Sequence, residues 1–120
     1  MWAISTTTLF DEWFSALETD SQVEVIAKVN LLKTLGPRLG RPHADTLKRS
    51  KHAQMKELRA KTSHAVLRIA FAFDPGRKGI LLVGGNKSGV SQQRFYRQLI
   101  SKADELYDEH LAKLYKKRGK

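Results

Sequence analysis

Hydrophobic positions in the first third of the chain predict one short strand and two helices. Residues 2–5 form an apolar run typical of an edge strand. The hydroxyl residues 6–8 can cap a helix, and apolar side chains then recur at helical spacing as far as residue 17. A second helix is predicted over 22–35, because Gly36-Pro37 is a strong stop signal. This segment therefore predicts an edge strand followed by a helical hairpin.

The middle of the chain predicts a basic loop and then three strands. Residues 36–54 have no clean period, whereas strands are expected over 55–59, 64–73 and 80–87. In the longest strand, large apolar side chains occupy the odd positions and smaller ones most of the even positions. Short connections such as Asp74-Pro75-Gly76 favour hairpins, and hairpins favour an antiparallel sheet.

The end of the chain is amphipathic and predicts a helix over 91–115. The expected fold is α+β: an antiparallel sheet with an N-terminal helical hairpin and a C-terminal helix packed on one face. The large odd-numbered side chains of 64–73 should meet these helices. We therefore expect the even-numbered face of that strand to stay uncovered.

Composition narrows the class of protein. A chain of 120 residues with 41% hydrophobic residues predicts a single domain over 1–120, in which 116–120 form a frayed tail. The absence of cysteine excludes disulfide scaffolds, thiolate metal sites and cysteine nucleophiles. The four histidines lack the spacing of metal ligands, so no metal or cofactor is expected. Because no leader or membrane-spanning stretch is visible, we expect a cytoplasmic protein without membrane association.

Charge is the first positive indication of function. The net charge is +10, but residues 1–37 carry −3, residues 38–68 carry +7 and residues 69–120 carry +6. This segregation is typical of a face that binds a polyanion. A solubilising basic surface explains the composition equally well.

Arg68 is the strongest single candidate, because a guanidinium is costly in the middle of a strand unless it is paired. It can clamp a phosphate, or it can form an ion pair with Glu57 on the neighbouring strand. Arg59 shares the face of Glu57 and can converge with Arg68. Lys87 follows two glycines, which we expect to admit a ligand backbone.

Further candidates lie in the basic loop and at the start of the last helix. Tyr96 can stack on a base or pack between the helix and the sheet. The basic residues expected to hold phosphates are Arg41, Lys48, Arg49 and Lys51 in the loop, and Arg94 and Arg97 in the helix.

The order of several segments resembles the phage-derived HigB-like toxins of the RelE/ParE superfamily. The segments are Met55–Arg59, Val66–Pro75 and Leu82–Gly89, supported by Leu35–Pro42 and by the helix holding Phe95-Tyr96 and Ala103-Asp104. The resemblance covers about residues 4–111. It implies a RelE-like fold and the toxin of a type II toxin–antitoxin system, acting as a ribosome-dependent mRNA endoribonuclease that inhibits translation.

The resemblance also implies partners and site residues. The partners are a cognate antitoxin, often a helix-turn-helix protein, together with the ribosome and mRNA, and a toxin–antitoxin hetero-oligomer is possible. The catalytic candidates are Arg68, Lys87, Arg59 and Tyr96, and the basic residues of the loop and helix become RNA-binding candidates.

The chain departs in one respect from a general acid–base ribonuclease, and this departure leaves an alternative function open. The chain lacks a suitably placed histidine pair, and arginine stays protonated, so acid–base catalysis is not explained. A non-nucleolytic toxin such as a gyrase poison, or a nucleic-acid-binding regulator of the same fold, is the alternative. A polar, cation-lined face around Arg68 favours the nuclease. An apolar face with Arg68 paired to Glu57 favours the alternative.

Overall fold

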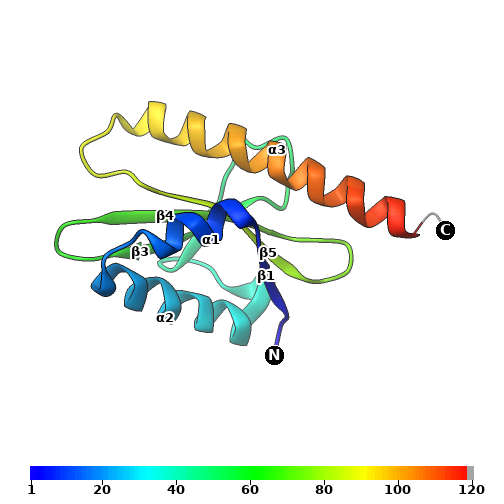
Figure 1. Cartoon of the computed structure of the whole chain (residues 1–120), viewed down its shortest axis with the longest axis horizontal. Helices are drawn as coiled ribbons and strands as arrows, with labels where there is room; N and C mark the ends of the chain where they lie inside the picture. Colours follow the sequence, from blue (N-terminus) through cyan, green and yellow to red (C-terminus); the bar gives the residue numbers. More distant parts are fainter. Residues whose placement is uncertain (119–120) are drawn as a thin grey trace.

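A five-stranded sheet lies between two layers of helices in the computed structural model, which describes residues 1–118 (Figure 1). The strands are β1 (Ile4–Thr6), β2 (Ala44–Thr46), β3 (Lys56–Lys61), β4 (Val66–Phe73) and β5 (Gly79–Asn86). The helices are α1 (Thr8–Ser15), α2 (Thr19–Leu35) and α3 (Gln92–Arg118), and a 3-10 turn spans Gly36–Arg38. Helix α3 continues to Arg118, and residues 119–120 of the expected frayed tail lie outside the described residues.

The sheet is mixed, with the order β1-β5-β4-β3-β2. Four strands pair antiparallel as expected, but β1 runs parallel to β5, which corrects the expectation of a wholly antiparallel sheet. No hairpin joins β1 to β5, because the chain passes through both N-terminal helices and three strands between them. Strand β2 lies inside the expected basic loop, where its three residues are too few to show a period.

The ends of the N-terminal helices follow local capping rules. Thr7 caps α1: its hydroxyl accepts from the backbone N–H of Phe10 at 3.0 Å and donates to the carbonyl of Leu82 on β5 at 2.6 Å. Helix α2 begins at Thr19, so its start lies before the predicted residue 22. It ends as predicted where Gly36 adopts a φ of 60°.

The helices cover both faces of the sheet, which corrects the expectation that they pack on one face. On one face, Val25 and Leu32 of α2 pack with the odd-numbered residues Leu67, Ile69 and Phe71 of β4. On the other face, α3 packs on Ala70 and Ala72, through Leu99, Ala103 and Tyr107. Small side chains on this face let the helix approach the strand closely. Figure 1 shows α2 and α3 on opposite sides of the strands.

Two glycines of β5 serve this packing. A Cβ at Gly84 would overlap the indole ring of Trp13, and a Cβ at Gly85 would lie 2.9 Å from the ring of Phe95. The glycines therefore make room for α1 and α3, and the expectation that they admit a ligand backbone is wrong. Within residues 1–118, no helix has both the length and the apolar character needed to cross a bilayer.

Candidate active site

The pairing of β3 with β4 brings one carboxylate and two guanidinium groups together. Arg59 and Arg68 are directly opposite each other, and Glu57 lies opposite Ala70. All three side chains project from the face on which α3 packs, near the first turns of that helix. The convergence of the two arginines, expected from the alternation of residues, is confirmed.

Glu57 is the centre of the hydrogen-bond network, and only 3% of its surface is exposed. Its Oε1 accepts from the Tyr96 hydroxyl at 2.7 Å and lies 3.5 Å from Nε of Arg68. Its Oε2 accepts from Nε of Arg59 at 3.0 Å and forms an ion pair with Nη2 of the same side chain at 2.9 Å, while that Nη2 donates to Asp45 at 3.5 Å. Both oxygens of this buried carboxylate are therefore satisfied by charged or polar donors.

Arg68 is held on three sides. Besides its contact with Glu57, its Nε donates to the Tyr96 hydroxyl at 3.2 Å and its Nη1 donates to the carbonyl of Leu67 at 2.9 Å. Its side chain is 12% exposed, whereas that of Arg59 is 33% exposed. Helix α3 covers the face up to Arg68, which corrects the expectation that Arg68 lies at the centre of an open face.

Both arrangements weighed for Arg68 are present at once. The ion pair with Glu57 exists, and the surrounding face is polar and lined by cations. Glu57 and Asp45, whose Oδ2 lies 3.5 Å from Arg59, both face the two guanidinium groups, and Lys87 adds a further positive charge nearby. Within the described residues, Nη2 of Arg68 has no hydrogen-bond partner, so it can still donate to a phosphate.

Lys87 and Tyr96 complete the cluster and carry shifted pKa values. The Lys87 ammonium lies 5.6 Å from the centroid of the Tyr96 ring. Burial and the neighbouring Arg68 charge lower the pKa of Lys87. Burial and the hydrogen bond to Glu57 raise the pKa of Tyr96, so its hydroxyl stays protonated. Lys87 therefore releases a proton more readily than an ordinary lysine does.

The network opens into a cleft of about 720 Å³, which we call the Tyr96 cleft. Its lining residues are Asp45, Thr46, Leu47, Lys48, Arg49, Glu57, Arg59, Gln92, Gln93, Tyr96 and Ile100. Two basic candidates from the loop, Lys48 and Arg49, thus lie at the same cleft as Glu57 and Tyr96. The lining combines three cationic side chains with two carboxylates, and the volume lies within the range of ordinary ligand pockets.

Four other RNA-binding candidates lie elsewhere. Arg41 is paired with Asp45 at 2.9 Å and is 74% exposed. Lys51 is paired with Asp108 of α3, and its backbone N–H donates to Asp104. Arg94 and Arg97 are exposed on α3, and neither lines the Tyr96 cleft. Lys51, Arg94 and Arg97 are therefore not gathered with Arg59 and Arg68, whereas Arg41 shares the Oδ2 atom of Asp45 with Arg59.

Two acidic residues were not predicted to belong to the site. The sequence indicated Glu57 only as an ion-pair partner of Arg68, although its alternation with Arg59 places both side chains on one face of β3. Asp45 lies 3.5 Å from Arg59 and opposite Glu57 in the sheet. The backbone N–H of Thr46 and the Arg41 side chain lower the pKa of Asp45. No sequence signal pointed to Asp45, because β2 itself was not predicted.

One group of side chains within residues 1–118 has the composition of a metal site. The ligand atoms of Glu18, Asp20 and His64 lie within 4.8 Å of one another, and all three residues are exposed. His64 Nε2 lies 3.3 Å from Glu18 and 3.5 Å from Asp20. Their contacts with the His64 ring account for their proximity, and none of the three residues lines the Tyr96 cleft or contacts Glu57.

Comparison with known proteins identifies the family. Residues 12–108 match the family described as "Phage derived protein Gp49-like". The chain belongs to this family. Two relatives from Mycobacterium tuberculosis are "Putative toxin HigB2", 43% identical over 83% of this chain, and "Putative toxin HigB3", 45% identical over 85% of it. The chain spans 50% of the first relative and 87% of the second.

The Gp49-like chain also shares its fold with a protein of known structure. An archaeal RelE from Pyrococcus horikoshii, in a RelE–RelB complex, matches with a TM-score of 0.55 at 10% identity. The match covers 74% of this chain and 98% of the archaeal one. The RelE-like fold expected from the resemblance is therefore confirmed, as is the resemblance to HigB-like proteins.

Proposed function

We propose that this chain is the toxin of a type II toxin–antitoxin pair and a ribosome-dependent mRNA endoribonuclease. The observation that carries the proposal is the buried Glu57 carboxylate held between Arg59 and Arg68 beside a cation-lined cleft. The names of the two mycobacterial relatives support the assignment as a toxin. Incubation with mRNA in a translation extract, with and without ribosomes, tests the activity. Cleavage that depends on ribosomes is the expected result.

The reaction is an attack of a ribose 2′-hydroxyl on the adjacent phosphorus, with loss of the 5′-oxygen of the next nucleotide. Arg68 and Arg59 stabilise the charge that develops on the phosphate oxygens. Glu57 is the carboxylate in the network and accepts the proton of the attacking hydroxyl. Lys87, whose pKa is lowered, gives a proton to the leaving oxygen. The network thus supplies the acid and base that the histidines do not.

Replacing Lys87 with arginine tests the proton donor. Arginine keeps the positive charge but cannot release a proton, so the cleavage rate should fall about 10²-fold while RNA affinity is retained. In the unmodified protein the protonated ammonium is the active form. Activity should therefore fall as pH rises through the lowered pKa of Lys87, below the ordinary lysine range. Equal rates for the two proteins across this pH range would exclude Lys87 as the donor.

Salt should weaken the binding of RNA or ribosomes. Phosphate contacts release counterions, so a protein that makes several of them loses affinity steeply between low and moderate salt. We expect log affinity to fall linearly with log salt, with a slope of about −0.7 for each phosphate contact on a single strand. Fluorescence anisotropy with a labelled RNA measures the slope. Affinity that stays constant across the series would contradict a polyanion-binding face.

The partner proposed for the toxin is an acidic antitoxin that covers the Tyr96 cleft. A negatively charged segment seated there competes with RNA for Arg59, Lys48 and Arg49. A complex that neutralises the toxin while leaving this cleft open would contradict the assignment.

A non-nucleolytic toxin or regulator of the same fold is the second candidate, and the Arg68–Glu57 ion pair favours it. In that case, growth arrest occurs while mRNA in the extract stays intact.

A further inference from the structure

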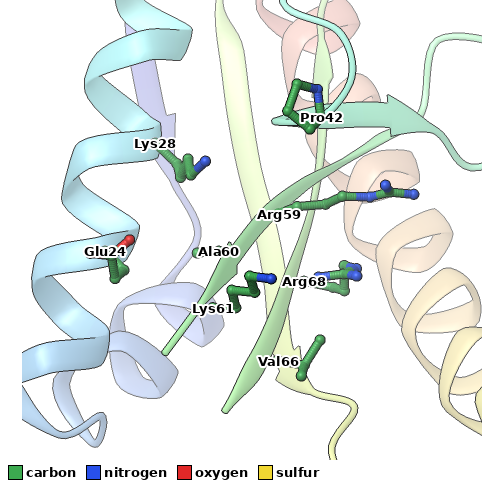
Figure 2. Close-up of a pocket in the computed structure, with 8 residues that line it drawn as sticks. All are labelled: Glu24, Lys28, Pro42, Arg59, Ala60, Lys61, Val66 and Arg68. Atoms are coloured by element: carbon green, nitrogen blue, oxygen red, sulfur yellow. The ribbon is translucent and has the colours of Figure 1, made fainter. Parts of the chain in front are cut away.

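A second cleft adjoins the Tyr96 cleft at the exposed end of β3. It has a volume of about 450 Å³ and is lined by Glu24 and Lys28 of α2, by Pro42 of the preceding loop, and by Arg59, Ala60, Lys61, Val66 and Arg68 of the sheet. We call it the Lys28 cleft. Figure 2 shows Lys28 pointing from α2 toward β3, and Lys61 pointing toward Arg68.

The two clefts meet at the arginines of the proposed active site. Arg59 lines both of them. Arg68 lines the Lys28 cleft and donates to Tyr96, which lines the other one. In Figure 2 the Arg59 side chain extends away from α2, so its stem borders one cleft and its guanidinium reaches Glu57. The two clefts are thus continuous in their lining at Arg59, and Arg68 lies beside both.

The positive excess of the Lys28 cleft comes from its two lysines, because Arg59 and Arg68 are paired with Glu57 and Asp45. Four of its side chains are cationic and one, Glu24, is acidic. Within the described residues, neither Lys28 nor Lys61 forms an ion pair with a carboxylate. Lys28 donates instead to Nδ1 of His43 at 2.7 Å, a contact that fixes its ammonium without cancelling the charge. Lys61 is exposed.

The remaining walls are apolar. Pro42, Ala60 and Val66 contribute no charge and give a surface on which a base or a ribose can lie. The volume falls within the roughly 300–1,000 Å³ of ordinary ligand pockets. A bare inorganic anion would leave most of this space and the apolar surface unused. The combination of apolar walls with two available ammonium groups is suited to a nucleotide.

We propose that the Lys28 cleft is a subsite for the nucleotide that flanks the cleaved phosphodiester, with Lys28 and Lys61 holding its phosphate. The subsite rests on the proposed RNA-cleaving function. Its class of ligand is a single-stranded ribonucleotide segment bound through phosphate charge and apolar contact.

The test is binding of a fluorescent 2′-O-methyl tetranucleotide, which cannot be cleaved, to the full chain at several salt concentrations. Lys28→Ala and Lys61→Ala should each weaken binding about five- to tenfold and reduce the salt slope by about 0.7. Lys33→Ala is the matched control on α2, outside this cleft, and should leave affinity unchanged. Uridine monophosphate should displace the probe at lower concentration than inorganic phosphate does.

The results separate the subsite from the activity. Loss of binding in both lysine variants supports the subsite even where ribosomal mRNA stays intact, an outcome that would remove only the proposed function. Unchanged affinity in folded Lys61→Ala and Lys61→Glu proteins overturns the subsite, as does a wild-type protein that cleaves mRNA but does not bind the probe. The subsite is also overturned if the lysine variants bind an acidic antitoxin more weakly than the wild type does but bind RNA equally well. Lys61 is exposed, so its variants test the idea if Lys28→Ala fails to fold.

Discussion

Arg68→Ala is expected to lower the rate of mRNA cleavage about 10²–10³-fold, because it removes a preorganised cation from the phosphoryl transition state. Growth arrest should be lost with it. The fold should survive, since Glu57 keeps its contacts with Tyr96 and both nitrogen donors of Arg59. Cleavage in a translation extract and growth after induction measure the effect, and thermal melting measures the folding.

Two companion variants sharpen this experiment. Arg68→Lys should recover little activity, because lysine lacks the planar, two-pronged donor geometry of arginine. Arg77→Ala is the control, since Arg77 is exposed in the turn at the other end of β4 and should leave cleavage unchanged. A folded Arg68→Ala protein with wild-type toxicity would show that the site is wrongly assigned. An unfolded one would show that the ion pair with Glu57 is structural.

Glu57→Gln is expected to reduce cleavage about 10³-fold, within the range for loss of a general base. The amide keeps the shape of the carboxylate but loses its charge, so Arg68 loses its carboxylate partner and Arg59 keeps only Asp45. Breaking a buried charge pair from one side costs about 3 kcal/mol of unfolding free energy. Urea denaturation measures this loss, and cleavage is compared at a temperature where both proteins are folded.

Tyr96→Phe helps to separate the two roles of Glu57, which are to position the arginines and to accept a proton. It removes the hydrogen bond to the Glu57 carboxylate, worth about 1–3 kcal/mol with a charged acceptor, and the bond that the hydroxyl accepts from Arg68, but leaves the contacts of Glu57 with both guanidinium groups. Exposed Glu105→Ala is the control for stability and should change it by less than about 0.5 kcal/mol. If Glu57→Gln is as active as the wild type, the carboxylate only positions the arginines and accepts no proton.

The sequence allowed much of the central sheet to be predicted, since alternation and turn signals are local. The hairpin from β3 to β4 follows from the pattern, and it is enough to bring Arg59 and Arg68 together. The placement of α3 could not be predicted in this way. Small residues such as Ala70 and Ala72 were interpreted as open surface, whereas they mark the close approach of a helix.

The acidic half of the site was harder to predict. Glu57 alternates with Arg59, so its place on the sheet face could be predicted from the sequence. Its contacts with two guanidinium groups and with the Tyr96 hydroxyl could not, because they depend on tertiary packing. Asp45 belongs to a strand of three residues that pairs with β3 across a long loop, and no local period identifies such a strand. The roles given to Arg68, Lys87, Arg59 and Tyr96 stay predictions.

The parallel pairing of β1 with β5 has a consequence for synthesis of the chain. Ile4 pairs with Gly79, and the cap residue Thr7 donates to the carbonyl of Leu82. Contacts this distant in sequence form late, because loop closure precedes them. Tyr96 comes from a helix made later still. The hydrogen-bond network around Glu57 therefore cannot be complete until the start of α3 has been synthesised and has packed on the sheet.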